Sequence, residues 1–117
     1  MVKKLAKKYL VKWTAPARED VNEIIEYISK TDINYAVKML DKIEEAVKNL
    51  DSFPEQYRLV PKLEKYGYFL YRDIVVEYWK IVYKIENNFV YIMLVMDGRR
   101  NLENILLKKM ILRENEI

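Results

Sequence analysis

The chain opens with a short alternating pattern and then changes to a helical one. Residues 9–14 alternate between apolar and polar side chains, which predicts a first strand. Pro16 suits the start of a helix, with Thr14 nearby as its cap and with Glu19 and Asp20 in its first turn. The apolar positions of this helix fall on one face. They are Ala17, Val21, Ile24, Ile25 and Ile28.

A second helical pattern begins after Thr31-Asp32, which breaks and restarts the chain. Its apolar positions keep a helical period for more than four turns. They are Tyr35, Ala36, Met39, Leu40, Ile43, Ala46, Val47 and Leu50. Two amphipathic helices joined this closely predict an antiparallel hairpin that covers one face of a sheet.

The second half of the chain has the pattern of strands. An irregular segment from Pro54 to Gly67 predicts a long loop, with room for a short turn of helix. Asn87-Asn88 suits a tight hairpin because Asn tolerates positive φ, whereas Tyr78-Trp79 is a weaker turn signal. The expected elements are strands over Tyr68–Glu77, Lys80–Glu86 and Phe89–Met96, followed by a helix from Asn101 to about Ile111.

The element order is therefore β-α-α-β-β-β-α. Helices followed by a run of strands indicate an α+β fold, with the helix hairpin packed on a mainly antiparallel four-stranded sheet. The strand over residues 89–96 is apolar throughout, as expected of a central strand covered on both faces. We expect a single domain over residues 1–117, with a basic tail at 1–8 and a frayed end at 112–117.

The amino-acid composition limits the chemistry that the side chains can perform. The chain has no histidine and no cysteine, which excludes disulfides, thiol chemistry, a Ser-His-Asp hydrolase and an ordinary zinc site. We therefore expect no metal and no cofactor. No apolar run reaches the roughly 18 residues that a membrane span needs, and no export signal is visible, so a cytoplasmic location without membrane contact is the expectation.

The net charge of +3 comes from the N-terminal arm. Five lysines precede the first acidic residue, and the rest of the chain carries a slight acidic excess. A general nucleic-acid binder carries its excess charge along a face of the fold. Non-specific binding of nucleic acid should therefore be weak.

Arg99 and Arg100 are the first candidates for function. Adjacent guanidinium groups at a strand end, near the start of a helix, are able to hold phosphate in a bidentate manner. The alternative is that Arg99 pairs with Asp97 or Glu103 and that both arginines are solvated.

Arg72, inside an otherwise apolar strand, is the second candidate. In the next strand Ile81, Tyr83 and Ile85 should face one way, and Lys80, Val82 and Lys84 the other. If Arg72 shares the face of Lys80 and Lys84, these three residues, with Arg99 or Arg100, form a basic concave surface on the side away from the helix hairpin. The alternative is that these charges serve solubility alone.

In their order and spacing, these segments resemble the RelE/ParE superfamily of bacterial and archaeal type II toxins, often labelled plasmid stabilisation proteins. The resemblance covers about Tyr9 to Leu107 and implies the RelE/ParE toxin fold. It rests on APAREDVNEIIEYI, PEQYRLVPKL, LYRDIVVEYWKIVYKI and NNFVYIMLVMDGRRNLENIL.

The resemblance implies a small cytoplasmic toxin that arrests growth until a co-expressed antitoxin neutralises it. The superfamily divides by target. RelE-like members cut mRNA in the ribosome with basic side chains and often a tyrosine, whereas ParE-like members inhibit DNA gyrase. The antitoxin is expected to dock on apolar grooves and on the basic concave face.

Several residues favour the ParE-like branch. The segment Tyr71–Ile74 lacks the paired lysines of the RelE-like strand, Lys80 stands where an arginine is usual, and the last helix has no tyrosine. The leading expectation is therefore a gyrase-directed toxin. The alternatives are a metal-independent mRNA endoribonuclease that acts with the ribosome, and an inactive antitoxin-binding module. In the endoribonuclease, the phosphate would be held by Arg72, Lys80, Arg99 and Arg100.

Overall fold

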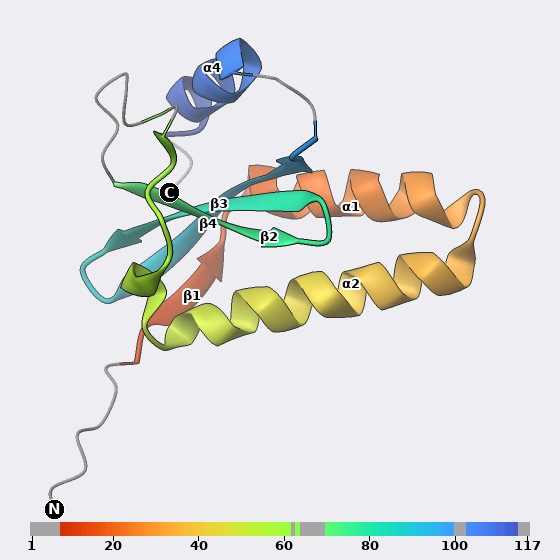
Figure 1. Ribbon diagram of the computed structural model, residues 1–117, viewed down its shortest axis with the longest axis horizontal. Helices are drawn as coiled ribbons and strands as arrows, with labels where there is room; N and C mark the ends of the chain where they lie inside the picture. Colours follow the sequence, from red (N-terminus) through yellow and green to blue (C-terminus); the bar gives the residue numbers. More distant parts are fainter. Residues whose placement is uncertain (1–7, 62, 64–69, 100–102, 115–117) are drawn as a thin grey trace, which may run out of the picture.

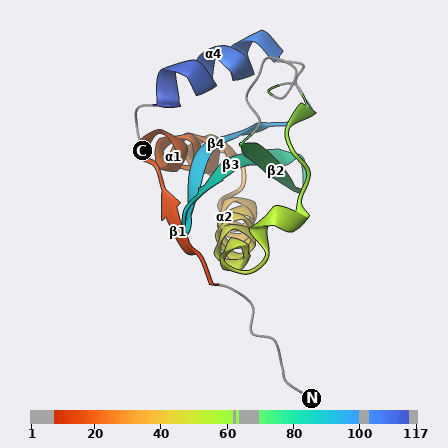
Figure 2. The same cartoon turned by 90° about the vertical axis from the view of Figure 1, so that its left-hand side faces the viewer.

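The computed structural model describes residues 8–61, 63, 70–99 and 103–114 of the chain. Two long helices lie side by side under one face of a sheet, and a shorter helix lies over the other face (Figures 1 and 2). The helices are α1 (Ala15–Ser29), α2 (Ile33–Lys48) and α4 (Glu103–Arg113), with 3-10 turns η1 (Asn49–Asp51) and η2 (Pro54–Gln56). The α+β prediction is confirmed.

Short polar side chains set where the two long helices begin. The Thr14 hydroxyl accepts from the backbone N–H of Ala17, and the Asp32 carboxylate accepts from that of Tyr35. Each bond satisfies one of the free N–H groups at a helix N-terminus. Thr14 also donates its hydroxyl to the carbonyl of Ile92 at 2.6 Å, which ties the start of α1 to the sheet.

The sheet has four strands in the order β1-β4-β3-β2. Its strands are β1 (Leu10–Trp13), β2 (Tyr71–Val76), β3 (Trp79–Glu86) and β4 (Phe89–Asp97). β1 runs parallel to β4, and the other two pairings are antiparallel, as expected of a mainly antiparallel sheet. The central position of β4 agrees with its apolar sequence.

Both hairpins turn through two residues. Asn87-Asn88 joins β3 to β4, as predicted, and Asn87 has a φ of 58°. The turn between β2 and β3 is Glu77-Tyr78, one residue before the predicted Tyr78-Trp79, and Glu77 carries the positive φ. Trp79 is instead a buried strand residue, so packing of this large side chain decides the register.

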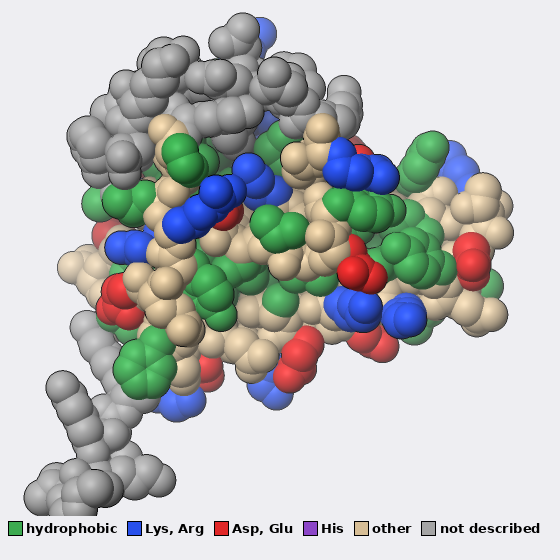
Figure 3. All heavy atoms as spheres, in the orientation of Figure 1, with side chains coloured by type: hydrophobic (Ala, Val, Ile, Leu, Met, Phe, Trp, Pro, Cys, Tyr) green, Lys and Arg blue, Asp and Glu red, His purple; other side chains and the backbone are tan. Residues whose placement is uncertain are grey.

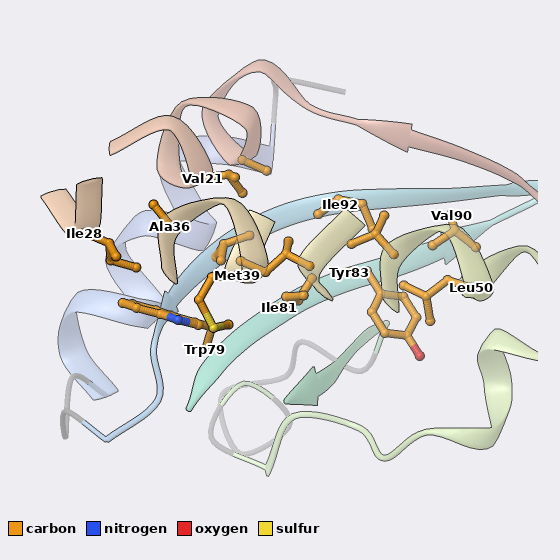
Figure 4. Close-up of a cluster of buried hydrophobic side chains, with 14 of the residues drawn as sticks. Val21, Ile28, Ala36, Met39, Leu50, Trp79, Ile81, Tyr83, Val90 and Ile92 are labelled. Carbon is orange, nitrogen blue, oxygen red and sulfur yellow. The ribbon is translucent and has the colours of Figure 1, made fainter. Parts of the chain in front are cut away.

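The main core lies between the helix hairpin and the sheet (Figure 4). Fully buried side chains of α1 and α2 face those of β3 and β4, including Met39, Ile81, Tyr83 and Ile92. The predicted alternation holds, because Ile81 and Tyr83 belong to this core while Val82 belongs to a smaller cluster on the opposite face. Met110 of α4 closes that second cluster.

A bulge in β4 separates the two halves of this strand. Tyr83 lies opposite Ile92 and Val82 lies opposite Leu94, so Met93 is the extra residue. Beyond this point β1 has ended, and the free edge of β4 is covered by side chains. Asp20 accepts from the N–H of Val95 at 3.0 Å, and Arg113 donates to the carbonyl of Met93 at 3.1 Å.

Asp20 and Arg113 also bind each other. Two bonds of 2.6 and 2.9 Å join the guanidinium to the carboxylate, and both side chains are largely buried. The expectation that Glu19 and Asp20 lie in the first turn of the helix is wrong, because α1 begins at Ala15 and has no acidic residue in that turn. Asp20 instead faces the sheet. α4 extends to Arg113, where this ion pair joins its last residue to α1.

Tyr83 links the core to the segment after α2. Its hydroxyl donates to the carbonyl of Pro54 at 2.6 Å in a buried position. Burial raises the pKa of the Tyr83 phenol above its ordinary value. The folded protein therefore keeps this phenol neutral at a pH where the unfolded chain begins to ionise it.

We expect Tyr83→Phe to lower the free energy of unfolding by about 1–2 kcal/mol at pH 7, because a buried carbonyl loses its donor. Since the folded pKa is raised, the stability from the neutral phenol is present below about pH 10 and declines as pH rises toward the folded pKa. The difference in free energy of unfolding between wild type and variant should therefore become smaller above pH 10. Urea unfolding across this range measures it, and a constant gap would contradict the assignment.

Candidate functional site

Arg99 stands at the end of β4 and is already engaged. Its Nε and NH2 groups donate to the two carboxylate oxygens of Asp97 at 3.0 and 2.7 Å, and its backbone N–H donates to the same carboxylate. The guanidinium lies 3.7 Å from the centre of the Tyr78 ring. Of the two arrangements considered for Arg99, the pairing with Asp97 is the one present.

This arginine, although paired, remains accessible. Its side chain is 62% exposed, and the hydrogen bonds to Asp97 raise its pKa, so it stays charged. A hydrogen bond between Tyr35 and Tyr78 raises the pKa of Tyr35 and joins α2 to the turn between β2 and β3. Asp97, Arg99, Tyr78 and Tyr35 thus form one connected surface group, which we call the Arg99 cluster.

Arg72 lies on the other face of the sheet from Lys80 and Lys84. In the observed register Arg72 is opposite Tyr83, whereas Lys84 is opposite Tyr71 and Lys80 is opposite Val75. The expectation that Arg72 shares a face with the two lysines is therefore wrong. Arg72 instead donates to the backbone carbonyl of Tyr57, at the border of the helix-covered face.

Lys80 belongs to a charged group on the opposite face. Its ammonium lies 3.6 Å from the carboxylate of Asp73, a side chain only 2% exposed. Arg58, from the segment after η2, binds the same carboxylate through its Nε at 3.0 Å. A buried carboxylate requires partners of this kind, since an unpaired charge in the interior is costly.

Lys84 is the most deeply buried of the expected basic residues. Its side chain is 5% exposed and lies 2.8 Å from Glu114 of the C-terminal segment and 3.3 Å from Glu86. It therefore joins the sheet to the end of α4 and is not part of an open basic surface. Burial raises the pKa of Glu114 in this pair.

The structure does not bring the expected residues together into one site. Arg72, Lys80 and Arg99 occupy three separate surroundings, and Arg100 lies outside the described residues, as do Lys3, Lys4 and Lys7 of the basic tail. Figure 3 shows the basic side chains of one face in separate groups, some beside acidic ones. Of the expected cations that the structure describes, Lys80, Lys84 and Arg99 each have a carboxylate partner, whereas Arg72 donates to a backbone carbonyl.

Arg58 and Asp73 were not identified from the sequence. Arg58 sits in an irregular segment with no periodic pattern that would place its side chain. Asp73, however, interrupts a strand of apolar residues, and an acidic residue in such a position indicates a nearby cation. The sequence therefore predicts that Asp73 has a cationic partner, although it does not identify that partner.

These charged side chains are better suited to binding a charged partner at the surface than to transferring protons. The exposed guanidinium groups of Arg58 and Arg99 present donors to a partner, but each already has a carboxylate acceptor. Across the part of the chain that the structure describes, no three potential metal ligands come together. None of the helices there has the length and apolar character to cross a membrane.

Comparison with known families identifies the chain. The family model described as the ParE toxin of the type II toxin-antitoxin system parDE matches residues 11–102. The chain belongs to the ParE toxin family. It is thus a type II toxin of a toxin-antitoxin module, a family whose members have a cognate antitoxin as partner.

A solved structure agrees with the ParE fold. The chain is similar to a chain of the chromosomal ParDE toxin-antitoxin system from P. aeruginosa, with a TM-score of 0.63 and 19% sequence identity. The likeness covers 79% of this chain and 98% of that one. A search of the curated proteins gives no match. The RelE/ParE fold predicted from the sequence is confirmed.

Proposed function

We propose that this ParE family member arrests growth by inhibiting DNA gyrase, and that its cognate antitoxin neutralises it. The family match over residues 11–102 carries the proposal. The placement of charges supports it. Cleavage of RNA needs cations free to stabilise a developing phosphorane, whereas Lys80 and Lys84 are held by carboxylates of this chain.

Two reactions separate gyrase inhibition from RNA cleavage. We expect the purified protein to block supercoiling of relaxed plasmid by gyrase, while mRNA translated by purified ribosomes stays intact. Expression alone should stop growth, and co-expression of the protein encoded by the adjoining gene should restore it. Ribosome-dependent mRNA cleavage with normal supercoiling would instead establish the endoribonuclease alternative.

The Arg99 cluster is our candidate for the surface that acts on gyrase. Arg99→Ala should raise the concentration needed for half-inhibition of supercoiling by about tenfold or more, as for an exposed arginine at the centre of an interface. Arg18 is a matched control, because it also pairs with a carboxylate, Glu44 at 2.8 Å, and lies over an aromatic ring, that of Trp13.

Arg18→Ala should leave inhibition within about twofold of wild type, since non-central contacts contribute little. If the two substitutions have equal effects, or if Arg99→Ala has none, the Arg99 cluster is not the surface that acts on gyrase. The proposal of gyrase inhibition itself would then still rest on the supercoiling assay.

A further inference from the structure

Arg99 uses only one side of its guanidinium group within the described residues. A guanidinium carries several N–H donors arranged as a planar fork. Its Nε and NH2 groups donate to the two carboxylate oxygens of Asp97 at 3.0 and 2.7 Å. Across the part of the chain that the structure describes, no group accepts from NH1. The edge formed by NH1 and NH2 is therefore open, on a side chain that is 62% exposed.

The ring of Tyr78 supports the guanidinium of Arg99. The guanidinium carbon lies 3.7 Å from the ring centre, a distance at which a cation is attracted to the face of the ring. Tyr78 in turn packs against the buried Trp79, with 4.9 Å between the two ring centres. Tyr35 of α2 holds the hydroxyl end of Tyr78 through the hydrogen bond described above. The ring beneath the arginine is thus held by neighbours from two elements.

The backbone also joins the two halves of the Arg99 cluster. Tyr78 lies in the turn between β2 and β3, and the next residue, Trp79, pairs with Asp97 at the end of β4 (Figure 1). The N–H of Gly98 donates to the carbonyl of Tyr78 at 2.7 Å. A Cβ atom on residue 98 would lie 3.1 Å from that carbonyl oxygen, closer than side chains normally approach, so glycine permits this contact. The fold therefore sets the position of Arg99 over Tyr78 before any partner binds.

The charges beside Arg99 favour a single acidic group as its ligand. Asp97 binds the arginine itself, and Glu77 precedes Tyr78 in the turn, where Lys42 offsets its charge at 3.2 Å. A nucleic-acid binder instead places several free cations along one face and neutralises several phosphates. The carboxylates of Asp97 and Glu77 would repel such a polyanion. A carboxylate on a protein surface matches one open guanidinium edge better.

We propose that the open edge of Arg99 binds a carboxylate of gyrase in a bidentate manner, and that Tyr78 is the positioning residue that holds the guanidinium for it. A planar guanidinium donates to both oxygens of a carboxylate along one edge, whereas a lysine ammonium is a point charge. Because the arginine is held before binding, little side-chain freedom is lost in the complex. The inference rests on the proposed function, since gyrase is the partner which that function names.

Arg99→Lys tests the bidentate contact. Lysine keeps the positive charge but has no second planar edge, and we expect its ammonium to stay with Asp97. The affinity of the full-length variant for purified gyrase without DNA should fall by about tenfold or more, as for the loss of a central arginine. Arg18→Lys, at a position that is also paired and stacked on a ring, should bind within about twofold of wild type.

Tyr78→Leu tests the positioning role, because it removes the ring and keeps an apolar side chain. Affinity for gyrase should fall by about three- to fivefold, the fold-change that corresponds to a cation–π contact at an exposed site. Tyr78→Phe keeps the ring and should bind within about twofold of wild type. In the Arg99→Ala background, Tyr78→Leu should cause no further loss, since the ring acts through the arginine.

Two comparisons separate the contact with gyrase from other causes. The urea midpoint of Arg99→Lys should match that of wild type, because the exchanged side chain is exposed, so its loss of affinity does not reflect unfolding. Affinity is also measured for gyrase bound to DNA. A loss in Arg99→Lys that appears only with DNA present would overturn the carboxylate as the ligand and assign a DNA phosphate instead.

The remaining outcomes distinguish the inference from the proposed function. Wild-type protein that neither binds gyrase nor blocks supercoiling would overturn both. If supercoiling is blocked while Arg99→Lys binds within about threefold of wild type, the inference fails and the proposed function stands. If Tyr78→Leu weakens binding equally with and without Arg99, Tyr78 does not act through the arginine, and its positioning role is excluded.

Discussion

Replacing Arg113 with methionine is expected to lower the free energy of unfolding by about 3–5 kcal/mol, the usual cost of removing one partner of a buried ion pair. Asp20 would keep only the N–H of Val95 as a partner, and the carbonyl of Met93 would lose its donor. The end of α4 would also lose one of its contacts with the sheet, while the Lys84–Glu114 pair would remain. Urea unfolding followed by circular dichroism measures the change.

The double variant Asp20→Asn with Arg113→Met provides the control. Asparagine carries no charge and still accepts from Val95, so the double variant should be more stable than Arg113→Met by about 1–2 kcal/mol. If Arg113→Met alone costs less than about 1 kcal/mol, the pair behaves as an exposed one and does not anchor α4.

Ile81→Ala is expected to cost about 2–5 kcal/mol, because it leaves a cavity in the middle of the main core. Ile81 is fully buried between the sheet and the helix hairpin, where Figure 4 shows it close to Met39. The free energy of unfolding in urea is again the measurement.

Ile33→Ala is the matched control, since the same atoms are removed from a side chain that is 61% exposed at the start of α2. It should change stability by no more than about 0.5 kcal/mol. Similar costs at both positions would mean that Ile81 does not lie in a closely packed core.

The sequence alone was sufficient to predict the helices and strands and, for most of them, which face is buried. Thr14 and Asp32 indicate where two helices begin, and Asn87 indicates a hairpin. The alternation from Ile81 to Ile85 predicts which side of β3 is buried. These signals are local, because each depends on residues within a turn or a strand.

The candidate site depended on contacts between distant residues, and the expectation that Arg72 shares a face with Lys80 and Lys84 was wrong. Across any two-residue turn an even-numbered residue lies opposite an odd-numbered one, so Arg72 had to join the face of Tyr83 and not that of the lysines. This odd–even pairing could have been predicted from the sequence, because the expected turn also had two residues. The pairing of Asp73 with Arg58 and of Asp20 with Arg113 could not, because no local pattern relates these positions.

The parallel pairing of β1 with β4 has a consequence for synthesis of the toxin. Leu10 lies beside Phe89, so the two paired segments are 79 residues apart in the sequence. Contacts between such distant segments form slowly and only after a long loop has closed. On the ribosome, β1 has no strand to join until β4 has been made. The sheet, and with it the finished toxin surface, is therefore completed only after β4 has been made.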